Sequence, residues 1–225
     1  MSIPTVAVII PVKARSTRLP GKNLKDLCGK PMMAYPILAA IGARGVSRVV
    51  VSTESDEVKK IALQYGAEVP FMRPDALTGD AVTSQEVLVH ALDELKKLDG
   101  YEPDYVLLLY PTSPLLSRER IEQAIALAVE KNADSVISGH FDKGHYWQES
   151  QGGGWERVYP KVLVNSQYQK PLFVENGALY LTRASIIRTQ MVAEPAQVLL
   201  MEQDENIDVD YPEDFAKVEQ RLKNK

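Results

Sequence analysis

The run Val6-Ala7-Val8-Ile9-Ile10-Pro11-Val12 passes directly into Lys13-Ala14-Arg15-Ser16-Thr17-Arg18-Leu19-Pro20-Gly21-Lys22-Asn23. The first stretch predicts a buried strand, and the second predicts a loop with four cations, two hydroxyls, an amide and a glycine. Open α/β sheets bind ligands at the carboxyl ends of their strands, where backbone N–H groups beside positive side chains favour a polyanion. The loop is not a Walker A sequence, because neither Lys22 nor Lys30 precedes a Ser or Thr. For the cation cluster alone, the alternative is a solvated basic turn.

Composition indicates one globular domain over residues 1–225. The chain is 45% hydrophobic and 25% charged, which is ordinary for a compact domain. Its net charge of −4 argues against a nucleic-acid polymer as partner, since a basic surface supplies most of that affinity. We expect no membrane span and no signal peptide, because the sequence has no run of about 18 apolar residues and no basic segment leading into an apolar one at its start. The single Cys28 is expected to be a bystander thiol in a cytoplasmic protein.

Apolar runs alternate with helix-period segments along most of the chain. The strands are predicted at residues 6–12, 49–51, 69–72, 105–109, 135–137 and 178–182, and the helices at residues 31–44, 55–65, 84–98, 117–132 and 212–222. The strand at 105–109 is wholly apolar, as is typical of a parallel strand buried on both faces. The alternation predicts an α/β fold with a doubly wound, mostly parallel sheet.

Residues 139–170 break this rhythm. The segment is polar and contains Trp147 and Trp155, with three consecutive glycines at 152–154 between them. Tryptophans on such a segment favour contact with a partner surface. The alternative is a β-hairpin folded back on its own chain, with the glycines at its turn.

Two carboxylates near the end of the chain form a candidate metal site. Asp208 and Asp210 fall on the same face of an extended segment, and Mg²⁺ usually takes one or two carboxylates together with substrate phosphate oxygens. The alternative is that Asp210 and Asp214 only begin the last helix, where carboxylates are favourable.

Arg73-Pro74, Asp80 and the pair Thr83-Ser84 precede the predicted helix at 84–98. An arginine and hydroxyls placed there predict one polar wall of a pocket. The alternative for Thr83 or Ser84 is an ordinary helix N-cap. His90, on the same helix, is expected to be structural.

Five motifs in chain order resemble those of the sugar-activating cytidylyltransferases, and within these the sequence is most similar to the acylneuraminate (sialic-acid-type) enzymes that make CMP-sugars. They are the loop from Ile10 to Asn23 with Gly29-Lys30-Pro31, Arg73-Pro74 with Ser84, Tyr110-Pro111-Thr112-Ser113-Pro114-Leu115, Asn176-Gly177-Ala178-Leu179-Tyr180, and Asp208-Val209-Asp210. The stretch 16–22 alone also resembles the 3-deoxy-manno-octulosonate cytidylyltransferases, and residues 31–37 resemble the pseudaminate-activating branch.

The resemblance implies a nucleotide-diphospho-sugar transferase-like fold, a protruding dimerisation arm at 139–170 and a homodimer. It also implies that CTP and an α-keto acid sugar react, with Mg²⁺ as cofactor, to give a CMP-sugar and pyrophosphate. We expect Lys22, Asp208 and Asp210 to be catalytic, the two aspartates holding the metal. The nucleotide is expected to contact Lys13, Arg15, Ser16, Arg18, Lys22, Asn23, Arg73 and Ser84, and the sugar to contact Tyr110, Gln167, Asn176 and Gly177.

Departures from the family pattern bear on the sugar. Tyr110 stands where the family has glutamine, and Asn165-Ser166-Gln167 stands where an Arg-Gln pair is common. A tyrosine offers one hydroxyl and a broad apolar face, so we expect a nine-carbon sugar of the legionaminate or pseudaminate type rather than N-acetylneuraminate. The alternatives are activation of 3-deoxy-manno-octulosonate or another sugar by a nucleotidyltransferase of this fold, and a nucleotide-binding regulator without catalysis.

Overall fold

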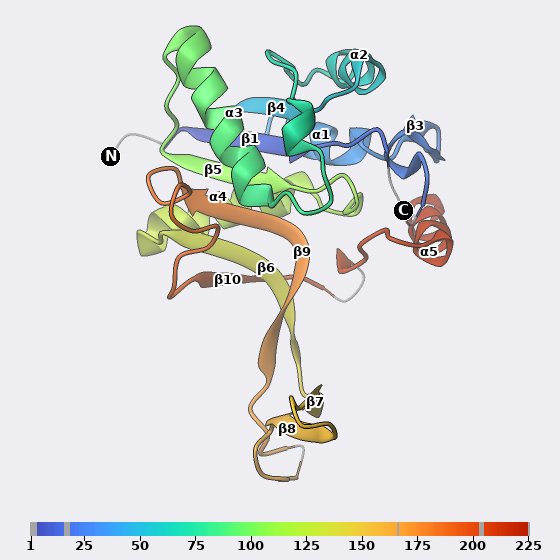
Figure 1. The fold of residues 1–225 in the computed structure, drawn as a ribbon, viewed down its shortest axis with the longest axis vertical. Coiled ribbons are helices and arrows are strands. Elements are labelled where there is room, and N and C mark those ends of the chain that lie inside the picture. The colour runs from blue at the N-terminus through green and yellow to red at the C-terminus, as the bar shows by residue number, and fades with distance from the viewer. Residues whose placement is uncertain (1–3, 16–18, 166, 203–204, 225) are drawn as a thin grey trace.

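The computed structural model describes residues 4–15, 19–165, 167–202 and 205–224. Six strands of this part form one twisted sheet in the order β10-β6-β9-β5-β1-β4 (Figure 1). Their bounds are β1 Val6–Pro11, β4 Val46–Ser52, β5 Tyr105–Leu109, β6 Ser135–Asp142, β9 Leu172–Arg183 and β10 Gln197–Leu200. The pairs β1–β4, β1–β5 and β10–β6 are parallel, and only β9 runs antiparallel to its neighbours β5 and β6. The predicted mostly parallel α/β fold is confirmed.

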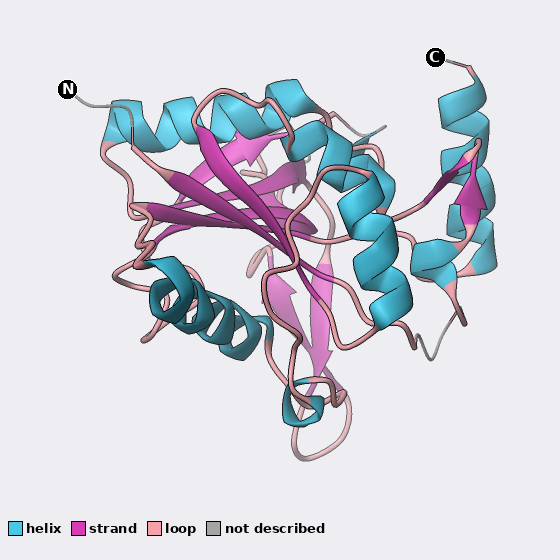
Figure 2. Cartoon of the chain, turned by 90° about the horizontal axis from the view of Figure 1, so that it is seen from above, coloured by secondary structure: helices cyan, strands magenta, loops and turns pink. Residues whose placement is uncertain are grey.

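Strand β1 is buried on both faces, and its residues alternate between two apolar layers. Val6, Val8 and Ile10 pack with α1 Ala34–Ala40, α2 Asp56–Gln64 and α4 Arg118–Lys131. Ala7 and Ile9 pack with α3 Ser84–Asp99 on the other face. Figure 2 shows helices on both sides of the strands. Because neither face of β1 meets water, its apolar run can end only in a polar loop at the edge of the sheet.

Residues 21–33 depart from the expected course. The predicted helix 31–44 is shorter, because Lys30–Pro31 forms strand β3 and pairs with β2 Asp26–Leu27 as a small hairpin. The N–H groups of Met32 and Met33 then donate to the carbonyls of Lys25 and Asn23, so α1 begins only at Ala34. A 3-10 turn, η1 Lys22–Leu24, precedes the hairpin.

Other boundaries differ as well. The expected strand at 69–72 is wrong: Glu68 makes an isolated bridge to Val50, and the chain then runs past β4 to the turn η2 Asp75–Leu77. Strand β10 was not expected from the sequence, and its Val198 and Leu200 remain partly exposed. The last helix, α5 Pro212–Lys223, packs Phe215 and Val218 against Leu27 of the small hairpin. None of the helices in the described part combines the length and the apolar character that a membrane span requires.

Strands β6 and β9 continue beyond the sheet and carry residues 143–165 and 167–171 away from the body (Figure 1). At the tip of this arm, β7 Tyr146–Glu149 pairs with β8 Trp155–Tyr159 in an antiparallel hairpin whose turn contains the three glycines. The alternative prediction, a β-hairpin with the glycines at its turn, is therefore confirmed for the strand pairing. The hairpin does not fold back on the body, however, but projects from it.

The body and the arm meet at an irregularity in β9. Ile137 pairs with Tyr180, and Gly139 pairs with Glu175. Between these two pairs β6 advances by two residues, whereas β9 advances by five. A Cβ on Gly139 would lie 2.1 Å from the carbonyl oxygen of Val174 and 2.7 Å from the ring of Phe173. Only glycine fits where the two strands approach so closely.

Replacing Gly139 tests this packing. Gly139→Ala should lower the free energy of unfolding by about 2 kcal/mol or more, because backbone must move to admit the methyl group. Gly152→Ala is the matched control: nothing lies within 4 Å of its Cβ position, so its effect should stay within about 0.5 kcal/mol. Urea denaturation followed by circular dichroism measures both, and equal destabilisation would contradict the close approach.

Candidate active site

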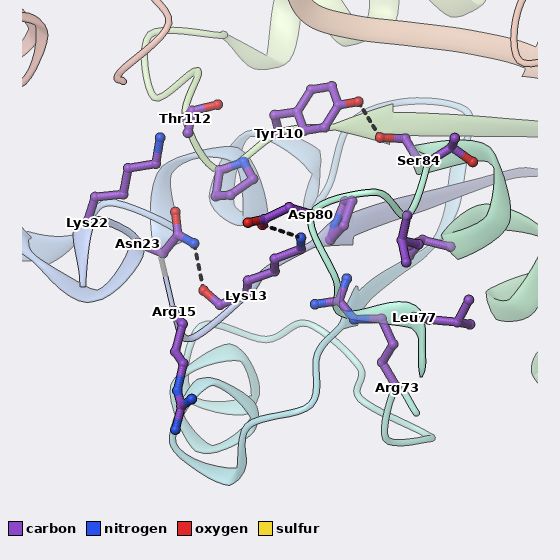
Figure 3. Close-up of a pocket in the computed structure, with 15 residues that line it drawn as sticks. Lys13, Arg15, Lys22, Asn23, Arg73, Leu77, Asp80, Ser84, Tyr110 and Thr112 are labelled. Carbon is purple, nitrogen blue, oxygen red and sulfur yellow. Dashed lines mark hydrogen bonds and ion pairs between the residues drawn. The ribbon is translucent and has the colours of Figure 1, made fainter. Parts of the chain in front are cut away.

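A cavity of about 280 Å³ opens at the carboxyl ends of β1 and β5 (Figure 3). Seven of the residues predicted to bind nucleotide or sugar line it together. The lining consists of Pro11, Lys13, Arg15, Lys22, Asn23, Arg73, Leu77, Asp80, Val82, Thr83, Ser84, Val87, Tyr110, Pro111 and Thr112. Ser16 and Arg18 lie outside the described residues. The cavity thus has four cations and one carboxylate, which favours an anionic ligand.

Lys13 and Asn23 hold the two ends of the loop that follows β1. The Asn23 Nδ2 donates to the Lys13 carbonyl at 2.9 Å, and Asn23 is only 5% exposed. The Lys13 ammonium crosses to the opposite wall, where it donates to the Gly79 carbonyl at 3.0 Å and lies 3.6 Å from the Asp80 carboxylate. The Asp80 side chain is 84% exposed, so this pair is one that a ligand can readily replace.

Lys22 joins the N-terminal loop to the predicted metal motif. Its side chain is 10% exposed, and its ammonium donates to the Asp210 carboxylate at 2.9 Å and to the Val209 carbonyl at 2.7 Å. These residues are 188 positions apart. The cation predicted to bind phosphate and the carboxylate predicted to bind metal are therefore direct neighbours.

The alternation of residues 208–210 follows from the burial of Val209. Val209 is fully buried against Leu27 and Phe215, and its N–H donates to the Thr112 carbonyl at 2.8 Å. On either side of it, Asp208 is exposed and Asp210 is half-buried. The alternative role, starting the last helix, is filled by Asp214. Its carboxylate accepts from the N–H groups of Tyr211 at 3.1 Å and Asp210 at 3.4 Å.

Arg73 is buried and bound inside the chain. Its guanidinium donates to the Glu54 carboxylate at 2.7 Å and to the Val12 carbonyl at 3.3 Å. Burial raises the pKa of Glu54, but the hydrogen bonds from Arg73 and from the Ala14 N–H outweigh it, so the net pKa is lowered. Glu54 was not among the residues expected at the site, although its position three residues after the expected strand at 49–51 is a signal that it lies at the same sheet edge.

A row of polar groups leads away from the cavity. The Ser84 hydroxyl and the Tyr110 hydroxyl share a hydrogen bond at 2.5 Å, and the Tyr110 ring meets Tyr180 edge to face with centroids 6.4 Å apart. The Tyr180 hydroxyl donates to Glu175 at 2.8 Å. Burial is the main cause that raises the pKa of Tyr110, and the negative charge of Asp208 adds to it. Burial and the hydrogen bond to Glu175 raise the pKa of Tyr180 as well, so both tyrosines are neutral at physiological pH.

The remaining predicted residues do not line the cavity. Asn176 and Gly177 lie in the β9 irregularity, and the Asn176 amide is engaged inside the chain: Oδ1 accepts from Ser138 at 2.7 Å, and Nδ2 donates to Asn206 at 2.7 Å. Gln167 is exposed on the arm, which extends away from the body (Figure 1). His90 packs edge to face on Phe71 and is not among the cavity lining.

Comparisons with known proteins identify the family of the chain. The cytidylyltransferase family model matches residues 7–219. The chain belongs to this family. A CMP-N,N'-diacetyllegionaminic acid synthase of Legionella pneumophila is 31% identical over 223 residues, which is 96% of each chain. A pseudaminic acid cytidylyltransferase of Campylobacter jejuni is 37% identical over 130 residues, covering 58% of this chain and 56% of the relative.

The fold has solved counterparts. A CMP:2-keto-3-deoxy-manno-octonic acid synthetase complexed with CTP superposes with a TM-score of 0.73 at 18% identity, over 98% of this cytidylyltransferase and 99% of that chain. At this identity the likeness concerns the fold. It supports the nucleotidyltransferase-like architecture expected from the sequence.

Proposed function

We propose that this cytidylyltransferase makes a CMP-sugar and pyrophosphate from CTP and a nonulosonic (sialic-acid-like) sugar. The observation that carries the proposal is the cationic cavity, in which Lys13, Arg15, Lys22 and Arg73 converge at the carboxyl end of β1. In the reaction the 2-hydroxyl of the sugar attacks the α-phosphorus of CTP and releases its proton to water. A P–O bond forms, and the bond from the α-phosphorus to the bridging oxygen breaks as pyrophosphate leaves with that oxygen. Such transfers depend mainly on positioning and on neutralisation of developing charge.

Each wall of the cavity suits one part of the nucleotide. Lys13, Arg15 and Lys22 would bind the triphosphate, together with Ser16 and Arg18 of the same loop. Asn23, Arg73 and Ser84 would bind the cytidine or the ribose. Thr83 supports this wall, because it forms a capping box with Glu86 that fixes the first turn of α3 beside the cavity.

The donor set at residues 208–210 fits a Mg²⁺ ion. Asp210 already receives a cation, the Lys22 ammonium at 2.9 Å, and the exposed Asp208 would be the second ligand. Among the described residues there is no group of three or more His, Cys, Asp and Glu side chains that could hold a metal. Two carboxylates with the other positions left to water and phosphate oxygens are typical of Mg²⁺. When bound, Mg²⁺ would neutralise charge on phosphate and sugar oxygens.

Tyr110 supports a sugar of the legionaminate or pseudaminate type. Its hydroxyl is engaged by Ser84 at 2.5 Å, so the ring presents mainly an apolar face toward a bound sugar. Such a face suits a deoxy or acylated sugar better than one rich in hydroxyls. The relatives named for legionaminic and pseudaminic acids are in accord with this choice.

A substrate panel with pyrophosphate release as readout tests the function. CTP should be the preferred nucleoside triphosphate, and kcat/KM should be highest for a 5,7-diamino nonulosonate. Preference for N-acetylneuraminate would overturn the sugar but keep the reaction, and preference for 3-deoxy-manno-octulosonate would support that alternative. No turnover with any sugar, despite CTP binding, would favour a regulator.

Replacing Asp210 tests the metal. Asp210→Asn should lower Mg²⁺-dependent kcat by about a hundredfold or more and weaken Mn²⁺ binding measured by electron paramagnetic resonance. CTP binding in the presence of EDTA should not weaken, because Lys22 is released from its ion pair. Glu213→Gln, at the exposed start of α5, is the control for the change in charge. Near-normal Mg²⁺-dependent turnover in Asp210→Asn would contradict the assignment.

The arm supports a homodimer. Its surface carries large apolar side chains that are each 40% or more exposed: Phe141, Trp147, Trp155, Val158, Val162, Leu163, Val164 and Tyr168. Val162 is 72% and Tyr168 73% exposed. Patches of this kind mark protein interfaces. We infer that a second copy covers the arm, and that Gln167 reaches the sugar only in that assembly.

Charges placed on the arm test the dimer. The double variant Val162→Asp, Leu163→Asp should be monomeric in multi-angle light scattering, because carboxylates at an apolar interface lose their water. Leu63→Asp, a 53% exposed leucine on α2, should keep the mass of the unaltered protein. An unaltered chain that is a monomer, or an arm variant that stays a dimer, would refute this assembly.

A further inference from the structure

We propose that Glu54 is the positioning residue of the nucleotide site: its carboxylate holds the loop after β1 and the Arg73 guanidinium in one arrangement. This inference rests on the proposed nucleotide site. Glu54 follows Thr53 at the end of β4, next to the end of β1, where the Val12 N–H donates to the Ser52 carbonyl at 3.0 Å. It is not among the cavity lining, so any effect on a ligand passes through other residues.

The two carboxylate oxygens bind different segments. Oε1 accepts the Ala14 N–H at 2.9 Å, and Oε2 accepts from Arg73 Nη2 at 2.7 Å. Ala14 lies between Lys13 and Arg15, and both of these line the cavity. One carboxylate therefore fixes the peptide that separates two phosphate-binding candidates.

The same carboxylate keeps Arg73 in place. The Arg73 side chain is 1% exposed, and a buried guanidinium requires a counter-charge. Its Nη2 also donates to the Val12 carbonyl at 3.3 Å, and the Arg73 N–H donates to the Thr53 carbonyl at 2.8 Å. Figure 3 shows the guanidinium on the cavity wall near Lys13. Glu54 thus joins β1, β4 and the segment before η2 at one point.

A positioning role makes a specific prediction. Without the Glu54 charge, the Arg73 guanidinium and the Ala14 peptide lose their common partner, and the cations around them no longer converge. A small misplacement of binding groups is enough to weaken a site strongly. A purely structural role would lower stability and leave the affinity for CTP unchanged in the folded protein.

The experiment compares Glu54→Gln with Glu68→Gln. Glu68 binds another largely buried arginine, Arg48, whose side chain is 16% exposed, and neither residue lines the cavity. Glu54→Gln should weaken CTP binding, measured by titration calorimetry, by about tenfold to a hundredfold. Glu68→Gln should leave it within about twofold while losing stability in urea denaturation, since a largely buried arginine loses its counter-charge but no residue of the cavity lining is touched.

Glu54→Asp gives a second variant that keeps the charge needed by buried Arg73. A side chain one methylene shorter cannot reach both partners, so we expect CTP affinity between that of Glu54→Gln and the unaltered chain. CTP binding within about twofold in both Glu54 variants, or an equal loss in Glu68→Gln, would overturn the positioning role. A failure of the unaltered chain to bind CTP would overturn the proposed nucleotide site and this inference together.

Discussion

The two-sided burial of β1 is the constraint on which the site depends. A strand with apolar layers on both faces has no water along its length, so every polar group that follows it must emerge at the edge of the sheet. Lys13, Ala14 and Arg15 emerge there beside the ends of β4 and β5. The neighbouring strands bring Glu54 and Tyr110 to the same edge. The position of the cavity therefore follows from the burial of β1 in the core.

Three of the four cations that line the cavity, Lys13, Lys22 and Arg73, are already paired inside the chain, but the pairs differ in strength. Lys13 and Asp80 are 3.6 Å apart with Asp80 largely exposed, and such a pair contributes about 0–1 kcal/mol. Arg73 and Glu54 are largely buried, and breaking a buried pair costs about 3–5 kcal/mol. A polyanion can thus displace Asp80 from Lys13, whereas Arg73 remains fixed. The Lys22–Asp210 pair is an intermediate case. Lys22 is largely buried, but its partner Asp210 is also a ligand of the proposed metal.

The irregularity in β9 joins the sheet to the arm and also contacts the segment that precedes residues 208–210. The five residues from Glu175 to Leu179 sit where the sheet becomes the arm, and Asn176 ties this point to Asn206, two residues before Asp208. Tyr180, on the body side of the irregularity, packs edge to face against Tyr110. One hydrogen bond therefore connects the base of the arm to the segment that leads to residues 208–210.

The sequence by itself determined the class of the sheet, most of its strands and the cationic loop, because apolar periodicity and the order of polar motifs are local properties. It also predicted that Asp208 and Asp210 share a face, and the burial of Val209 between them is in keeping with that prediction. Only the tertiary structure decided which polar groups meet. Lys22 finds Asp210 at a separation of 188 positions, Glu54 binds both Ala14 and Arg73, and Asn176 is engaged within the chain. Local pattern carries no information on such partners, since buried charges and amides are satisfied by whichever group packing brings within hydrogen-bond distance.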